Sequence, residues 1–382
     1  MLGGLVKKRF EGAFFLILFI VIFFGFFGYM SNIMGMENMM NTIMKTSYDL
    51  LMKTVFYIMA ITVLAGALGK IMIEFGVVRL LEFILAPLMR PLFNLPGVAS
   101  LGALMAFFSD NPAIIGLSKD KNFCRYFKKY ELVSLTNFGT AFGMGLVVIT
   151  FMISLGHRYV MPAMIGFAGA VIGGIISTRL MQKMIRPIVG DEYVTFDEEG
   201  TEEDIKIESN EGPFLRLLNA VLDGGKMGVD LGLAIIPGVL IISTFIMIIT
   251  FGPSAAGTYT GAAYEGVPLL PEIAGKIGFV FKYLFGFARP EFIAFPITSL
   301  GAVGAAMSLV PKFKSVITGN EIAVFTAMGM CWSGYLSTHT AMLDALNYRN
   351  LISRAIISHT IGGIFAGIFA HYIYLAVTII LK

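Results

Sequence analysis

Long apolar runs separated by short polar segments dominate this chain. Each of seven runs has the roughly 20 predominantly apolar residues that a helix needs to cross the hydrocarbon core of a bilayer. These runs are 13–30, 52–73, 131–153, 160–178, 227–250, 321–343 and 355–380. None of them alternates polar and apolar residues, the pattern of a membrane β-barrel. We therefore predict an all-α, polytopic integral membrane protein.

Two further apolar segments are interrupted. Residues 97–118 are broken by the polar, proline-containing stretch 109–112, and residues 290–310 contain Pro290 and Pro296. Basic residues flank the first segment on both sides, so it enters and leaves on the cytoplasmic side. We expect each segment to form a re-entrant helical hairpin. The alternative for 97–118 is one continuous span, which would place an aspartate and a proline in lipid at a cost of a few kcal/mol.

Three amphipathic segments alternate with these runs. Charged residues recur at helical spacing in 75–93, which predicts a helix lying at the membrane interface. We expect a second interfacial helix at 213–225 and an amphipathic helix at 273–287, after a Gly/Pro-rich external stretch at 252–271.

The two halves of the chain share short patterns in the same order. Glu131 and Glu321 each precede a Thr by five residues and a Gly by eight. A Ser-Leu-Gly-Ala stretch precedes both, and an Ile-Gly-Gly stretch follows both at similar distances. Chance is the alternative, because these residues are common in membrane helices. The order of the matches favours an internal duplication. The predicted units are a transmembrane helix with an external segment (1–49), a first repeat (50–186), an acidic linker (187–212) and a second repeat (213–382).

The charges of the loops predict how the repeats are oriented. The basic cluster at 7–9 holds the N-terminus in the cytoplasm, ahead of an uncleaved first helix. The acidic stretch 191–211 is a solvated cytoplasmic linker, for which a cation-sensing role is the alternative. On this count the first hairpin opens to the cytoplasm and the second to the outside, so the repeats are inverted. Many secondary transporters place inverted repeats with broken helices near the middle of the membrane.

Composition agrees with a membrane protein and narrows its chemistry. Hydrophobic residues make up 57% of the chain and charged residues only 14%. The net charge of +3 comes from loop Lys and Arg and indicates membrane topology, so nucleic acid is not an expected partner. Cys124 and Cys331 lack metal-ligand or redox spacing and are expected to be free thiols. No hydrolase or nucleotide-binding motif is present, and we expect neither an enzyme nor a bound cofactor.

Polar residues at the predicted helix breaks are the candidate binding groups, because unwound backbone and carboxylates can contact solute or ion. At some positions capping, a local ion pair or a bond to the residue's own helix explains the polar group equally well. His339 and His359 could form a proton relay or only a bond between helices. The candidate substrate-binding residues are Ser109, Asp110, Asn111, Asn137, Thr140, Arg289, Glu291, Thr298, Ser299, Trp332, Ser333, Ser337 and Thr338.

The order of interfacial helix, hairpin and two spans, repeated, resembles the gate (nucleoside-recognition) superfamily. The residues that carry the resemblance are Phe108-Ser-Asp-Asn-Pro-Ala113, Glu131 to Gly145, and Trp332-Ser-Gly-Tyr-Leu-Ser-Thr-His339. The superfamily includes concentrative nucleoside transporters, membrane cores of ferrous-iron transporters and spore-maturation membrane proteins. The signatures with which nucleoside transporters bind base and ribose are not matched here. The resemblance therefore implies the fold, and it does not imply a nucleoside as substrate.

These observations predict a secondary-transporter-like protein of the cell membrane that moves a small polar solute, nucleoside-like or other. Na⁺ or H⁺ is the expected coupling ion, and the expected partners are the lipid bilayer, the solute and further copies of the chain. The alternative is a membrane interaction or scaffold protein of the spore-maturation type, whose hairpins are structural.

Overall fold

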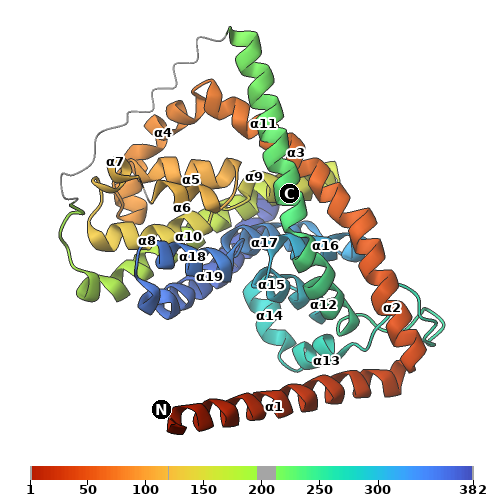
Figure 1. Cartoon of the computed structure of the whole chain (residues 1–382). Helices are drawn as coiled ribbons and strands as arrows, with labels where there is room; N and C mark the ends of the chain where they lie inside the picture. The colour runs from red at the N-terminus through yellow and green to blue at the C-terminus, as the bar shows by residue number, and fades with distance from the viewer. Residues whose placement is uncertain (1, 119, 196–211, 381–382) are drawn as a thin grey trace.

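The computed structural model describes residues 2–118, 120–195 and 212–380 (Figure 1), and in this part of the chain it contains helices and no strand. Most of the predicted acidic linker, 196–211, lies outside the described residues. Among the described residues, six helices have the length and composition to cross a membrane. They are Gly12–Met34, Met36–Glu74, Lys129–Ser154, His157–Val189, Pro213–Ile248 and Arg349–Ile380. The prediction of an all-α polytopic membrane protein is confirmed.

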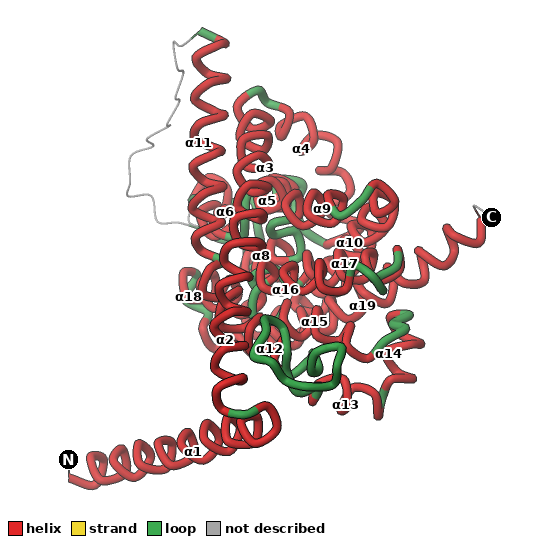
Figure 2. Tube along the Cα trace, turned by 90° about the vertical axis from the view of Figure 1, so that its right-hand side faces the viewer, coloured by secondary structure: helices red, strands yellow, loops and turns green. Residues whose placement is uncertain are grey.

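Helix α1 (Leu2–Met34) extends away from the body of the molecule in both views (Figures 1 and 2). Its apolar side chains from 14 to 24 are exposed, whereas Met30 and Met34 pack against the start of the next helix and residues near Ile248. Such an apolar surface suits lipid contact.

Two long helices form one side of the body. The first joins α2 (Met36–Asp49) through a π-helical turn to α3 (Phe56–Glu74), and the second joins α11 (Pro213–Ala234) through a π-helical turn to α12 (Thr244–Ile248). The sequence prediction of a separate interfacial helix at 213–225 is therefore wrong. The predicted external segment 31–49 is also mostly helical and continuous with the following span.

Glycines bring α3 and α11 into close contact. A Cβ on Gly224 would stand 2.3 Å from the Gly66 carbonyl oxygen, so only glycine fits there. The Thr62 hydroxyl donates a hydrogen bond of 2.7 Å to the Gly228 carbonyl oxygen. Small residues of this kind allow membrane helices to pack closely. This contact supports α11 as a continuous helix through the charged segment 223–230.

Both interrupted segments form pairs of short helices. In the first, α5 (Ala99–Phe108) packs against α6 (Pro112–Leu117), and the break falls at 109–111 as predicted. In the second, α15 (Ala294–Ser299) packs against α16 (Val303–Leu309). A helix of ten residues is about 15 Å long, half the hydrocarbon thickness. Neither segment can therefore cross the membrane as an unbroken rod.

Two of the predicted continuous spans are broken in the middle. Residues 131–153 form α8 (Lys129–Thr140) and α9 (Gly145–Ser154), and 321–343 form α17 (Gly319–Cys331) and α18 (Tyr335–Ala345). The first break ends at Met144 (φ 54°) and the second at Gly334 (φ 104°), both left-handed. Helix α8 contacts α18, and α9 contacts α17, so the two broken helices run antiparallel. This arrangement agrees with inverted repeats, whose orientation in the membrane stays a prediction.

The two repeated glutamates play the same local role. The buried carboxylates of Glu131 and Glu321 each accept a bond from the backbone N–H three residues earlier, at Lys128 and Thr318. Each closes a capping arrangement at the start of its broken helix. The repeated Glu is therefore a helix-start signal.

The remaining elements enclose the broken helices. Helices α10 (Val160–Val189) and α19 (Ile352–Ile380) pack along each other and against α17. The predicted helix at 75–93 is α4 (Val77–Leu88) with a π-helical turn (Met89–Phe93), and the predicted helix at 273–287 is two helices. The shorter elements are α7 (Lys121–Cys124), α13 (Leu269–Lys276) and α14 (Gly278–Phe285), with 3-10 turns at His157–Tyr159, Pro290–Ile293, Val310–Phe313 and Arg349–Leu351.

Candidate functional site

Two adjoining cavities lie between the long helices and the hairpins. The hairpin cavity has a volume of about 420 Å³, and the α3–α11 cavity has a volume of about 340 Å³. Asp110, Leu231 and Ala234 line both, so the two spaces meet at the tip of the first hairpin. The volumes lie within the range of about 300–1,000 Å³ that is typical of small-molecule sites.

The hairpin cavity is lined by residues from several of the helix breaks in the fold. Its wall contains the tip of the first hairpin, the loop 301–304 of the second hairpin, the break between α17 and α18, and one face of α11. Its polar side chains are Asp110, Asn111, Ser333, Ser337 and Thr338. Five of the thirteen candidates from the sequence thus lie together here.

Asn111 fixes the hairpin tip to the break between α17 and α18. Its Nδ2 donates to the carbonyl oxygen of Ser333 at 3.2 Å and approaches the Ser333 hydroxyl at 3.4 Å. That hydroxyl in turn donates to the carbonyl oxygen of Thr140, at 3.4 Å. The Thr140 hydroxyl bonds the Thr136 carbonyl of its own helix, so this residue contributes a backbone atom to the site.

The amide oxygen of Asn111 has no hydrogen-bond partner within the described residues, and the side chain is only 3% exposed. A buried acceptor without a partner is costly and needs an explanation. The other break reaches this oxygen too, because a Cβ on Gly143 would stand only 2.0 Å from it. A bound hydrogen-bond donor or a cation would satisfy the oxygen.

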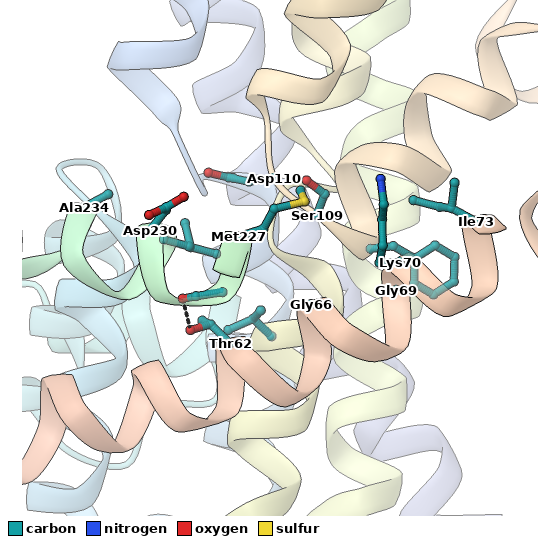
Figure 3. Close-up of a pocket in the computed structure, with 14 residues that line it drawn as sticks. Thr62, Gly66, Gly69, Lys70, Ile73, Ser109, Asp110, Met227, Asp230 and Ala234 are labelled. Atoms are coloured by element: carbon teal, nitrogen blue, oxygen red, sulfur yellow. Dashed lines mark hydrogen bonds between the residues drawn. The ribbon is translucent and has the colours of Figure 1, made fainter. Parts of the chain in front are cut away.

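The α3–α11 cavity contains charges that sequence reasoning missed. Figure 3 shows Ser109 and Asp110 of the hairpin tip beside Lys70 of α3 and Asp230 of α11. Two carboxylates and one ammonium group therefore face this space. The available signal was an ionisable residue within a predominantly apolar helix, which in membrane proteins marks a functional position by default.

Seven of the thirteen predicted binding residues line neither cavity, namely Thr140, the pair Arg289 and Glu291 described below, and Asn137, Thr298, Ser299 and Trp332. The amide of Asn137 donates to Ser177, Ser358 and the Ala355 carbonyl between α8, α10 and α19. Thr298 and Ser299 donate to carbonyls of their own helix, and the Trp332 indole N–H donates to the His359 carbonyl at 3.2 Å. Asn137 and Trp332 therefore donate to groups between helices and line neither cavity, contrary to expectation, although the amide oxygen of Asn137, like that of Asn111, has no hydrogen-bond partner among the described residues.

Arg289 and Glu291 lie in a separate cavity. They form an ion pair of 3.3 Å and line a space of about 380 Å³ together with Lys312 and the loop after α12. Neither of them lines the hairpin cavity or the α3–α11 cavity. The local ion pair that was the alternative explanation is present.

Metal binding finds no support among the described residues, where no cluster of three or more His, Cys, Asp or Glu side chains is placed to hold an ion. Both cysteines are free thiols and buried. The oxygen atoms of the hairpin tip are the polar atoms best placed to contact a ligand.

Comparison with known proteins identifies the fold. A family model described as Gate, nucleoside recognition, matches residues 55–156, the region from α3 to the turn after α9. The structure resembles that of CNTnw, a concentrative nucleoside transporter, in an inward-facing substrate-bound state, with a TM-score of 0.56 at 12% identity. That match covers 96% of this chain and 85% of CNTnw. A CNTnw variant in an outward-facing state gives a TM-score of 0.54 at 13% identity, covering 96% and 86% of the two chains.

An uncharacterized protein of Alkalihalophilus pseudofirmus is 28% identical over 224 residues. The match covers 54% of this chain and 46% of that protein, so the chain aligns with about half the length of this relative. The predicted resemblance to the gate superfamily is confirmed by the family model and the transporter structures. Residues 55–156 therefore match the gate (nucleoside-recognition) family model, and the chain has the fold of the CNTnw structures.

Proposed function

We propose that this protein is a secondary transporter that carries a small polar solute across the cell membrane by alternating access. The solute binds in the hairpin cavity, where the tips of both hairpins meet the break between α17 and α18. A small shift of either hairpin would change both the shape of this cavity and its access to water. A transporter that works by alternating access requires a binding site whose walls can move in this way.

The observation that carries the proposal is the unpaired, buried amide oxygen of Asn111 in the cavity wall. Other buried acceptors also lack a partner, the amide oxygen of Asn137 among them, but Asn111 belongs to the lining of a cavity that is large enough to hold a ligand. Ser333, Ser337 and Thr338 add hydroxyls to the lining of the same cavity. This set of acceptors and hydroxyls suits a neutral, hydroxyl- or amide-bearing solute such as a nucleoside, nucleobase or similar small molecule.

Asp110 gives the site an ionisable group where the two cavities meet. Coupling to Na⁺ or H⁺ through groups near the hairpin tip is part of the proposal, because a carboxylate and a free amide oxygen are both oxygen ligands. A transporter of this kind needs a cation that binds with different affinity in its two conformations.

Counterflow into proteoliposomes tests the proposal. Vesicles preloaded with unlabelled uridine, adenosine, hypoxanthine, leucine or citrate are diluted into the labelled compound, with Na⁺ present or absent. We expect exchange of at least one compound in the wild type. Asn111→Ala and Asp110→Ala should reduce it about tenfold or more, the equivalent of about 1.4 kcal/mol of lost contact.

Arg289→Ala is the matched control, because this half-exposed residue lines the separate cavity. It should exchange solute like the wild type. Full exchange in the Asn111 and Asp110 variants would place the site elsewhere. If no compound in the panel exchanges under any cation condition, the transporter proposal is overturned, which leaves the scaffold alternative.

A further inference from the structure

The least explained buried group outside the cavities is a pair of histidines in the membrane core. His339 of α18 and His359 of α19 are both fully buried, and their ring centroids are 4.6 Å apart. Neither lines a described cavity. Two imidazoles this close inside apolar helices can hold at most one positive charge, because like charges repel strongly where water is excluded.

Hydrogen bonds define which atom of the pair is free. His359 Nε2 contacts the Cys331 carbonyl oxygen, and a carbonyl only accepts, so this nitrogen carries a hydrogen. Its Nδ1 then accepts from the Ser177 hydroxyl, at 2.8 Å. Both nitrogens of His359 are therefore satisfied in the neutral ring.

His339 is different. Its Nδ1 contacts the Tyr335 carbonyl oxygen and must donate to it. Its Nε2 therefore has an unprotonated lone pair, and this atom has no hydrogen-bond partner among the described residues. A buried imidazole nitrogen with a free lone pair can accept a proton, and in this conformation His339 Nε2 carries none.

The surroundings of the pair hold few other titratable groups. The ring of Tyr335 on α18 lies beside both imidazoles, and the carbonyl oxygen of Cys331 on α17 contacts His359. Helices α8 and α10 contribute Asn137 and Ser177, which do not titrate. In the last turn of α18, Asp344 pairs with Arg349 at 3.2 Å, and both side chains are exposed. Protonation of the pair would thus introduce an uncompensated charge into this part of the core.

The pair is also joined to the break between α17 and α18. His359 holds the carbonyl of Cys331, the last residue of α17, and the next residue, Trp332, returns a bond to the His359 carbonyl. His339 follows Thr338, which lines the hairpin cavity. Successive residues of a helix are about 100° apart, so His339 lies on the face of α18 next to the one that lines the cavity.

We propose that His339 Nε2 is a proton-binding site, and that its protonation favours a conformation in which the break between α17 and α18 opens toward water. The nitrogen takes a proton from solvent, forming an N–H bond and an imidazolium ion. The charged ring is stable only where it reaches water, so proton binding and opening are linked reciprocally. This inference rests on the proposed transport function for its role, and names the proton as the coupling ion.

Cys331 provides a direct test that needs no solute. In a Cys124→Ser background it is the one thiol of the chain, fully buried beside the break. Its labelling rate with N-ethylmaleimide is measured from pH 7.5 to pH 5.5 and divided by the rate of the denatured protein at the same pH, which removes the chemical pH dependence of the thiol. We expect this ratio to rise at least fivefold on acidification, the lower end of ordinary site-to-site coupling.

His339→Asn is the critical variant. Its Nδ2 can still donate to the Tyr335 carbonyl in the place of Nδ1, while the atom at Nε2 is deleted. The ratio should become independent of pH in this variant. His371→Gln is the control, since this buried ring bonds Asn320 instead and should leave the response intact. His339→Gln is tested alongside, in case the side chain of asparagine, which is shorter than that of glutamine, prevents folding.

Transport provides a second, separable measurement with the labelled compound that exchanges best. His339→Asn should retain counterflow, which moves no net proton, but lose accumulation driven by an inward proton gradient. A pH-independent labelling ratio in the wild type overturns the proton site, as does gradient-driven accumulation that survives in His339→Asn. Absence of counterflow in the wild type overturns the transport proposal alone, because the labelling measurement still decides the proton site.

Discussion

Gly143 offers the sharpest test of the contact between the first hairpin and the two helix breaks. It lies in the turn between α8 and α9, and a Cβ there would stand 2.0 Å from the amide oxygen of Asn111 and 2.5 Å from the hydroxyl of Ser333. The backbone of Gly143 does not have a positive φ, so alanine itself adopts the turn without strain. The effect of Gly143→Ala therefore comes from displacing those two side chains.

The magnitude follows from the bonds that would be lost. Rotating Asn111 away breaks its contacts with Ser333, worth about 1 kcal/mol net, and leaves a buried donor unsatisfied at about 1–3 kcal/mol. A total of about 2–4 kcal/mol would weaken docking of the hairpin tip by about 30- to 700-fold. We expect a melting temperature lower by a few degrees and a large loss of solute exchange.

A double-mutant cycle isolates the contact. Asn111→Ala removes the oxygen that the new methyl group would meet, so the two substitutions together should cost about 1–2 kcal/mol less than their sum. Gly116→Ala in α6 is the control, because nothing lies within 4 Å of its added Cβ. Thermal unfolding and counterflow are measured on the wild type, the two single variants, the double variant and the Gly116→Ala control. Strict additivity, or a Gly143→Ala protein as stable and active as the Gly116→Ala protein, would refute the reasoning.

Three further outcomes follow from the structure. Gly228→Ala places a Cβ 2.4 Å from backbone atoms of α3 and should lower the free energy of unfolding by more than about 3 kcal/mol. The expected readout is loss of monodisperse protein in size-exclusion chromatography. Gly225→Ala is the control, because its Cβ meets only one side-chain atom, at 3.7 Å, and this variant should stay monodisperse. Glu131→Ala removes a buried helix cap and ion-pair partner and should lower the free energy of unfolding by about 2 kcal/mol, while the exposed Glu192→Ala changes the melting temperature little. Arg186 of α10 hydrogen-bonds the Asp191 carboxylate and lowers the pKa of that carboxyl from its usual 3.8. The stabilisation from this pair is therefore present above pH 3.8 and is lost as the pH falls through the lowered pKa of Asp191. Asp191→Asn should flatten this part of a plot of melting temperature against pH.

The breaks differ in how visible they are along the chain. Residues 109–112 combine polar residues with a proline, and a proline inside a helix removes a backbone hydrogen bond, so a break is favoured locally. Residues 141–144 and 332–334 contain little more than glycine and apolar side chains. A glycine inside a membrane helix usually serves packing, and only the meeting of the hairpins with α8, α9, α17 and α18 decides that the chain unwinds there.

The sequence by itself determined that the chain is an all-helical membrane protein with an interrupted hairpin at 97–118 and two glutamates that begin equivalent helices. Hydrophobic length, proline and capping act locally, and for that reason they can be recognised without the fold. The tertiary structure alone decided that Asn111 faces the cavity while Asn137 is bonded between three helices, and that Lys70 and Asp230 share a cavity with Asp110. Those outcomes depend on which partner reaches each polar group, and such partners come from segments 40 to more than 200 residues apart.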